Sequence, residues 1–275
     1  MVSETLKFQQ IYLEKHAMKK RRQAPLLVML MMGIGFLGKC TLNSHPVVTP
    51  LPPGPLPIEF NTPDGARLAG KYYPAAANPA PVAVLMHGGG GRMQNWVDIG
   101  LVAWLQNRGG ASSGAETNPL PPGCSYAVFI FTYSGDWIEA GRAALETAKT
   151  LPGADPRQIL AMGASVGADD AAEACAAVDG CLGALSFSPV GSLDGVRYAD
   201  SVAHMDQDRK LAWCIATDGD HGCPPAQGRR YRAIVYSGMA HGLQLFTPGR
   251  APAIWQDTRA FLENALAPNL SENIY

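Results

Sequence analysis

The sequence predicts an α/β domain with a mostly parallel central sheet and helices on both of its faces. Short runs made almost entirely of apolar residues recur at 82–86, 159–162, 182–187 and 211–216, and such runs are typical of strands buried on both faces. Segments with apolar residues at helical spacing separate them, and this alternation favours a parallel sheet. The chain has 275 residues, of which 47% are hydrophobic, so it is long enough to form one large domain.

The first 40 residues have the pattern of an export signal. The basic run 19–22 (KKRR) precedes an apolar run at 24–38, and about 15 apolar residues fit an export signal but are short for a membrane span. The segment 37–40 resembles a bacterial lipoprotein cleavage box, except that Lys39 stands where a small residue is usual. Two outcomes therefore remain open: lipid attachment at Cys40, which would anchor the chain to a membrane, and plain export with cleavage nearby.

Residues 41–57 contain six prolines and predict an extended tether ahead of a folded domain at 58–275. Export would place the cysteines in an oxidising compartment, where the two closest pairs, Cys175 with Cys181 and Cys214 with Cys223, would each close a short loop. The formal net charge is −1, so there is no basic surplus for nucleic-acid binding.

Within the domain, the pattern predicts a hairpin over 58–73 that turns at 62–65 (TPDG). The remaining expected elements are strands at 82–86, 127–131, 159–162, 182–187, 211–216 and 233–236, and helices at 95–105, 137–151, the segment after 165, and 254–265. The long connection 108–125 should lie at the end of the sheet away from any site, so it receives no substrate role. The connection 188–210 is too short for a large helical cap, which predicts an open site.

Four consecutive glycines follow the strand at 82–86 in the sequence His87-Gly88-Gly89-Gly90-Gly91. Glycines let a backbone approach a ligand closely with its amides pointing inward, as stabilisation of a developing oxyanion requires. His87 is interpreted as a structural residue that ties this loop down, and a merely flexible loop is the alternative interpretation.

A second glycine-framed segment, 163–167 (GASVG), follows the strand at 159–162 and precedes an alanine-rich helical segment. A strand, a tight turn and a helix with a serine at the apex indicate a nucleophile elbow, with Ser165 as its nucleophile. Side chains at Gly163 and Gly167 would collide with the neighbouring strand and helix.

From the glycine loop through this elbow to the loops that carry Asp220 and His241, the residues resemble the α/β-hydrolase superfamily over roughly 58–266. The lack of a cap makes the chain look most similar to dienelactone-hydrolase-like serine hydrolases. Many of those use a cysteine nucleophile, so lactone specificity is not implied here. The resemblance implies Ser165 as nucleophile, His241 as general base and then acid, and Asp220 as the carboxylate that orients His241.

Asp218 is the alternative to Asp220, because it lies nearer the end of the preceding strand, whereas Asp220 stands four positions before a proline, as the family's acid often does. The oxyanion donors implied are the backbone amides of Gly89 and Val166. The function expected is that of an exported carboxylesterase acting on a small-molecule ester without a metal or organic cofactor. The alternatives are a peptidase or amidase of the same fold and a non-catalytic envelope binding protein.

Other candidates carry weaker signals. Asp169 and Asp170 lie in the first turn of the helix after Ser165, where carboxylates stabilise the helix dipole, and contact with a cationic substrate is the alternative. His221 has no second metal ligand at a useful spacing. Side chains that either line the site or pack in the core are Tyr133, Trp137 and Phe246.

Overall fold

The computed structural model describes residues 54–107, 118–121, 123–249 and 253–267, all of which belong to the compact unit Cys40–Tyr275. The predicted export signal, with Lys39 and Cys40, and the tether up to residue 53 lie outside the described residues. Among the described helices, none combines the length and the apolarity needed to cross a membrane.

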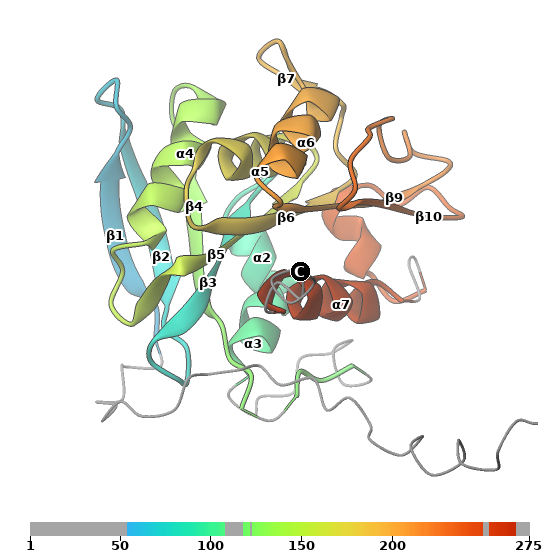
Figure 1. Cartoon of the computed structure of the whole chain (residues 1–275). Coiled ribbons are helices and arrows are strands. Elements are labelled where there is room, and N and C mark those ends of the chain that lie inside the picture. Colours follow the sequence, from blue (N-terminus) through green and yellow to red (C-terminus); the bar gives the residue numbers. More distant parts are fainter. Residues whose placement is uncertain (1–53, 108–117, 122, 250–252, 268–275) are drawn as a thin grey trace, which may run out of the picture. The chain divides into compact units, whose positions relative to one another are not determined.

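The described residues contain an eight-stranded sheet in the order β1-β2-β4-β3-β5-β6-β9-β10 (Figure 1). β2 pairs antiparallel with both β1 and β4, and every pair from β4 to β10 is parallel. The predicted, mostly parallel sheet is therefore confirmed. The strand bounds are β1 Leu56–Asn61, β2 Arg67–Tyr73, β3 Ala80–Met86, β4 Ala127–Thr132, β5 Ala154–Ala164, β6 Cys181–Phe187, β9 Leu211–Thr217 and β10 Tyr231–Tyr236.

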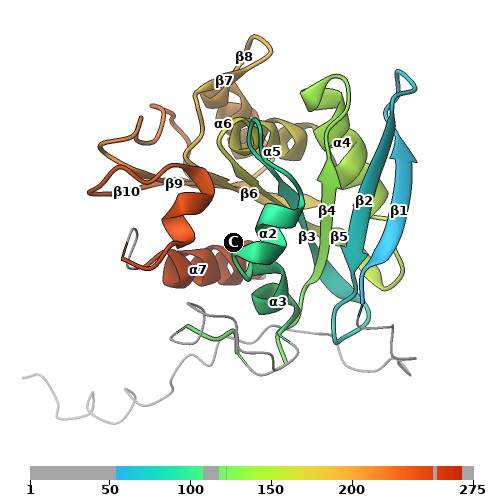
Figure 2. The same ribbon diagram turned by 180° about the vertical axis from the view of Figure 1, so that it is seen from behind.

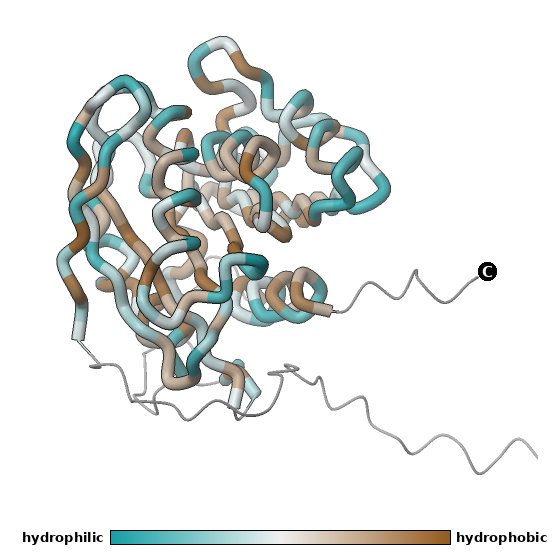
Figure 3. Tube along the Cα trace, turned by 60° about the vertical axis from the view of Figure 1, so that its left-hand side comes forward, coloured by the Kyte–Doolittle hydropathy of each residue, from teal (hydrophilic) through white to brown (hydrophobic). Residues whose placement is uncertain are grey.

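Helices cover both faces of the sheet (Figures 1 and 2). Alternate residues of one strand point to opposite faces, so Val84 of β3 joins a core with α4, α5 and α6, while its neighbour Leu85 joins a core with α2, α3 and α7. Figure 3 shows the hydrophobic colours along the central strands and the hydrophilic ones on the outer turns. The helix bounds are α2 Gln94–Asp98, α3 Leu101–Gln106, α4 Trp137–Ala148, α5 Val166–Ala177, α6 Tyr198–Gln207 and α7 Ile254–Leu266.

The predicted hairpin is present as β1 and β2, with β1 starting two residues before the expected beginning of the domain. Gly65 has φ 93° and its amide donates to the Thr62 carbonyl at 3.0 Å, which closes the turn. A positive φ is the conformation that glycine adopts at no steric cost, which explains why the TPDG pattern predicts the turn correctly.

One expectation needed correction, and one was confirmed with an element that the sequence analysis did not identify. The single helix expected over 95–105 is instead α2 and α3, because Gly100 between them adopts a left-handed conformation with φ 83°. The connection 188–210 contains a small hairpin, β7 Ser192–Leu193 with β8 Val196–Arg197, and then α6. Because α6 packs on α5 and β9, it is the crossover between two parallel strands and forms no cap.

In the connection between α3 and β4, the residues that the structure describes, 118–121 and 123–126, do not line the pocket, as expected, and the rest of the predicted segment 108–125 lies outside the described residues. In its described part, the Asn118 carbonyl accepts from Trp104 Nε1 at 2.9 Å, and the Pro119 carbonyl accepts from Arg259 of α7 at 3.1 Å. These contacts hold residues 118–119 against α3 and α7.

Both predicted short disulfides form: Cys175 with Cys181, and Cys214 with Cys223. Beside the first of them, the buried Lys210 Nζ donates to the carbonyls of Cys175, Ala176 and Val178 at 2.8 to 3.2 Å. The lysine thus satisfies carbonyls at the C-terminal end of α5.

Candidate functional site

Ser165 lies at the sharp turn between β5 and α5, with φ 58° and ψ −130°, an uncommon backbone conformation for a residue other than glycine. The two flanking glycines make the turn sterically feasible. A Cβ at Gly163 would lie 1.8 Å from the Gly167 carbonyl oxygen, and a Cβ at Gly167 would lie 2.4 Å from the Met86 carbonyl oxygen. The segment therefore forms the tight turn that the sequence predicts.

The glycine loop after β3 packs directly against this turn. A Cβ at Gly88 would lie 2.8 Å from the Ser165 Cβ, so only glycine allows this approach. A Cβ at Gly89, the next residue, would lie 3.7 Å from a methyl group of Val166. Neither the Gly89 nor the Val166 amide donates to another described residue. The two expected oxyanion donors thus lie on adjoining segments beside Ser165.

His87 is a buried residue that holds the loop, as interpreted from the sequence. Its Nδ1 lies 2.9 Å from the Gly88 carbonyl oxygen, and its ring packs edge-on against the aromatic rings of Tyr133 and Trp137. Burial lowers the pKa of His87, so the neutral ring is favoured.

His241 and Asp220 meet across two loops, one after β10 and one after β9. His241 Nδ1 lies 2.6 Å from Asp220 Oδ2. Asp218 is engaged elsewhere: its carboxylate accepts from the Gly238 amide at 3.0 Å and from the Ser237 hydroxyl at 3.3 Å. The bond to the Gly238 amide is the main cause that lowers the pKa of Asp218. Of the two candidate carboxylates, Asp220 is the one that contacts the imidazole.

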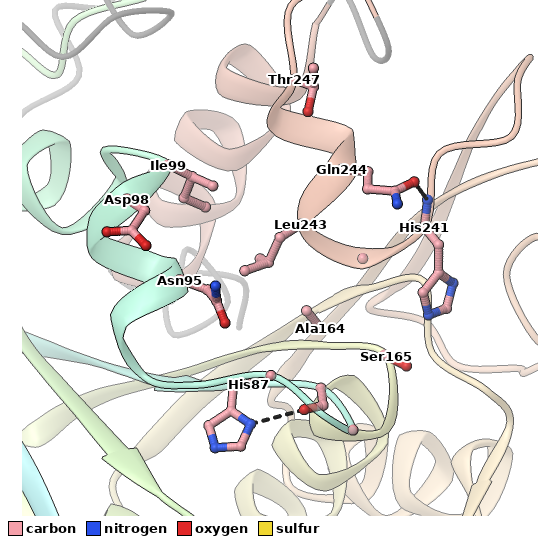
Figure 4. A pocket seen from close by; sticks show the side chains of 14 residues that line it. His87, Asn95, Asp98, Ile99, Ala164, Ser165, His241, Leu243, Gln244 and Thr247 are labelled. Carbon is pink, nitrogen blue, oxygen red and sulfur yellow. Dashed lines mark hydrogen bonds between the residues drawn. The ribbon is translucent and has the colours of Figure 1, made fainter.

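Ser165 and His241 line the same pocket, which has a volume of about 460 Å³ (Figure 4). A Cβ at Gly242, directly after His241, would lie 3.8 Å from the Ser165 amide nitrogen, so the two segments are in contact. Within the described residues no hydrogen bond joins Ser165 Oγ to the imidazole. Catalytic hydrogen bonds are often long before substrate binds and tighten in the complex.

Several residues of the pocket were not singled out by the sequence analysis. Asn95, Asp98 and Ile99 come from α2 and the residue after it, and Leu243, Gln244 and Thr247 come from η2 Gly242–Phe246 and its end. In Figure 4, Ile99 and Leu243 lie on facing segments that border the pocket. The only sequence signal for them is position, since they follow the glycine loop and His241 by a few residues.

The two acidic residues after the elbow are buried and do not line the pocket. Asp169 accepts from the amides of Val190 and Gly191 at 2.8 and 2.9 Å, and burial raises the pKa of Asp169 to about 6. Asp170 accepts from the Tyr133 hydroxyl at 2.5 Å. Both therefore fasten neighbouring segments to α5, a different structural role from the dipole interaction that the sequence suggested.

The remaining candidates pack in the core or stand alone. Tyr133 and Trp137 stack with ring centroids 3.9 Å apart, and Phe246 packs on Phe187 and Trp255, so none of the three lines the pocket. In the parts of the chain that the structure describes, His221 belongs to no group of three potential metal ligands.

Comparison with known proteins gives matches in structure only. No protein-family model matches the chain, and no curated protein matches it in sequence. Among solved structures, it is similar to the Pyrococcus furiosus esterase Pf2001, with a TM-score of 0.53 and 13% identity over 82% of this chain and 96% of that one. It is also similar to EstE1, a thermostable carboxylesterase from a metagenomic library, with a TM-score of 0.55 and 17% identity over 80% and 92% of the two chains.

A third similar structure is Atu1826 from Agrobacterium tumefaciens, a protein of unknown function described as a putative α/β hydrolase. Its TM-score is 0.51, with 18% identity over 77% of this chain and 96% of that one. At identities this low, the structural similarity shows a common fold and does not identify the chemistry, which depends on the residues of the pocket.

Proposed function

Because the chain has the α/β-hydrolase fold, we propose that it is a serine hydrolase that cleaves carboxylic esters through an acyl-enzyme on Ser165. One observation carries the proposal: the imidazole of His241, which is hydrogen-bonded to Asp220, lines the same pocket as Ser165, a serine with positive φ at a strand-to-helix turn. A serine hydroxyl is a weak nucleophile unless a base takes its proton, and this arrangement supplies the base and its orienting acid.

The proposed reaction begins with the proton on His241 Nδ1, where Asp220 accepts it in a hydrogen bond. The other ring nitrogen, Nε2, is then free to accept the Ser165 proton as Oγ attacks the ester carbonyl carbon. The carbonyl π electrons move onto oxygen, and the resulting oxyanion accepts from the Gly89 and Val166 amides.

Collapse of this tetrahedral intermediate breaks the bond to the alcohol oxygen, which leaves with the proton held on His241. Water then attacks the acyl-enzyme, and His241 takes a proton from it and returns one to Ser165 as the acid departs. Asp220 stays ionised and stabilises the imidazolium that forms twice in the cycle. Every proton and electron pair is accommodated by groups of the chain, the ester and water.

The pocket supports a small ester as the substrate. A volume of about 460 Å³ lies in the lower part of the range of small-molecule sites, and Ile99 and Leu243 give it an apolar border. In addition to the reaction, we propose that the protein is exported, in lipid-anchored or released form. The two disulfides support this, since disulfides persist in oxidising compartments.

The test of the proposed function is hydrolysis of p-nitrophenyl esters of short and long acyl chains, with Ser165→Ala beside the wild type. We expect turnover that disappears in the variant and falls in acid, because only the neutral imidazole can accept the serine proton. An anilide substrate in the same assay separates esterase from amidase activity. A folded wild type that neither turns over esters nor takes up a fluorophosphonate on Ser165 would contradict the proposal and favour a binding protein.

Export is tested separately, by cell fractionation and mass spectrometry of the N-terminal peptide. A diacylglyceryl mass on Cys40 would establish the anchored form, and a cleaved peptide without it the released form. An intact N-terminus in the cytoplasm would contradict export.

A further inference from the structure

The orientation of one peptide group decides whether Gly89 can serve as an oxyanion donor. The Gly88 carbonyl oxygen accepts from the Gly91 amide at 2.9 Å and lies 2.9 Å from His87 Nδ1. A trans peptide is planar, with its carbonyl and amide pointing in opposite directions. With the Gly88 carbonyl directed at these two donors, the Gly89 amide has to point the other way.

The neutral His87 ring can make this bond in one tautomer only. A carbonyl oxygen accepts and never donates, so the proton of the neutral ring must lie on Nδ1. His87 Nε2 is buried and has no hydrogen-bond partner among the described residues. The position of the His87 ring therefore depends on packing. The ring of Tyr133 packs edge-on against the His87 ring, with centroids 5.0 Å apart and planes at 85°. His87 is labelled in Figure 4 among the residues that line the pocket.

Tyr133 is itself fixed by a hydrogen bond to the elbow helix. Burial raises the pKa of Tyr133 well above its ordinary value, so the phenol keeps its proton and donates it to Asp170 Oδ2 at 2.5 Å. Asp170 is fully buried, and its other oxygen, Oδ1, has no partner in the described part of the chain. The carboxylate occupies space that Gly141 of α4 leaves open, since a Cβ there would lie 2.2 Å from Oδ2.

These contacts join the two segments that carry the two oxyanion donors. Asp170 belongs to α5, whose first residue is Val166. Tyr133 follows β4, and its ring packs against His87, the residue that holds the glycine loop containing Gly89. We infer that Tyr133 is a positioning residue, whose hydroxyl bond to Asp170 fixes the glycine loop relative to α5 and so aligns the Gly89 and Val166 amides on one oxyanion. The inference rests on the proposed serine-hydrolase function.

Tyr133→Phe is the direct test, because it keeps the ring against His87 and removes only the hydroxyl. Tyr72→Phe is the matched control: Tyr72 is buried, whereas Tyr133 is half-buried, and it likewise donates a single hydrogen bond, to the Pro152 carbonyl at 2.8 Å, but it lies on β2 away from the pocket. Asp170→Asn is the conservative variant, since its amide oxygen can still accept from Tyr133.

We expect Tyr133→Phe to lower kcat roughly tenfold with KM little changed, a fraction of the hundredfold to thousandfold that loss of a whole donor costs. The affinity for a trifluoromethyl ketone, which forms a tetrahedral adduct, should fall by a similar factor. Asp170→Asn should stay within about threefold of the wild type. A loss of kcat in Tyr133→Phe no greater than in Tyr72→Phe, or a change confined to KM, would overturn the inference.

Hydrogen exchange of the segment 87–91 provides a measurement independent of turnover. Tyr133→Phe should speed exchange of the Gly91 amide, which donates to the Gly88 carbonyl, and Tyr72→Phe should not. Equal exchange in the two variants would overturn the inference even if the protein proved inactive on esters. An inactive wild type with the expected exchange difference would instead overturn the proposed function alone.

Discussion

The two groups of segments that carry the candidate triad are built in different ways. The elbow side, residues 87–91 and 163–167, consists of backbone packed on backbone, and any side chain at Gly88, Gly163 or Gly167 would meet atoms closer than 3 Å. The acid–base side, residues 217–224 and 237–242, is more exposed. Met239 is 70% exposed, and Asp220 and His241 are only partly buried.

Hydrogen bonds and a covalent bond hold the acid–base side, together with one close approach, since a Cβ at Gly219 would lie 2.5 Å from the Gly238 carbonyl oxygen. The Thr217 hydroxyl donates to the Ala240 carbonyl at 2.9 Å, Asp218 joins the two loops through Gly238, and the Cys214–Cys223 disulfide closes the loop that carries Asp220. We therefore expect substitutions of Gly88, Gly163 or Gly167 to alter folding and activity together, whereas single substitutions of the polar side chains on the acid–base side should alter activity with little effect on folding.

The largest expected effect comes from Gly163→Ala on the elbow side. Its Cβ would lie 1.8 Å from the Gly167 carbonyl oxygen, and backbone cannot yield as a flexible side chain does. We expect a loss of at least about 3 kcal/mol of unfolding free energy by urea denaturation, and of turnover with it. Gly89→Ala, with 3.7 Å of clearance, should unfold near the wild-type midpoint. Equal midpoints for the two variants would remove the basis of the comparison.

Asp220→Asn should separate activity from stability on the acid–base side. An amide at this position cannot hold the same imidazole tautomer, so kcat should fall by about a hundredfold to ten-thousandfold, while the melting temperature changes little. Asp218→Asn is the control, because Asp218 contacts the loop after β10 and not His241. A larger loss of kcat in Asp218→Asn would reverse the assignment of the acid.

Removal of either disulfide should reduce stability by a similar amount, so the two variants can be compared for their effects on kcat. Replacing either pair by serine should lower the unfolding free energy by about 2 to 3 kcal/mol, because both close short loops. Only the Cys214–Cys223 variant should also lose kcat, severalfold at 25 °C, since that bond closes the loop of Asp220. If the Cys175–Cys181 variant lost as much kcat, the effect of removing Cys214–Cys223 would not be specific to the loop that carries Asp220.

The smallest expected effect on turnover is that of Asp169→Asn, which sharpens the comparison through pH. Burial raises the pKa of Asp169 to about 6 from an ordinary value of 3.8, so between these values the folded state binds more protons than the unfolded state. The contribution of Asp169 to stability is therefore present below about pH 4 and is lost as the pH rises to about 6, by at most about 3 kcal/mol.

The amide introduced by Asp169→Asn does not titrate, so the unfolding free energy of this variant relative to the wild type should improve between pH 4.5 and 7.5. Urea denaturation of both proteins at the two pH values measures the difference. A difference that is constant with pH would mean that Asp169 ionises alike in the folded and unfolded states.

Local sequence patterns were sufficient for the sheet, the hairpin and the tight turn at Ser165. All-apolar runs identify doubly buried strands, and a glycine-framed serine between a strand and a helix fits few backbone geometries. The pattern failed at Gly100, where apolar spacing continues across a left-handed residue that ends one helix and begins another. It also missed α6, whose buried positions Tyr198, Ser201, Val202 and Met205 give only a weak helical stripe, since the polar Ser201 interrupts it.

The parts of the site that the sequence did not predict depend on contacts between distant segments. Nothing local to Asp170 indicates that Tyr133, 37 positions earlier, donates to it. Likewise, Ile99 and Leu243 become neighbours of one pocket only when the glycine loop and the loop after β10 meet over Ser165. Such pairings depend on the order of the strands in the sheet, which could not be predicted from local patterns in a single sequence.

The lysine at the far end of the elbow helix has a consequence for the serine at the near end. α5 has 12 residues, or about 18 Å of rise, and Lys210 clamps its last carbonyls while Ser165 precedes its first amide. The hydrogen bonds from Lys210 to the C-terminal end of α5 restrict movement of this helix along its axis. The position of Ser165 along the axis of α5 is thus set in part by a residue at the opposite end of the strands, about one helix length from the pocket.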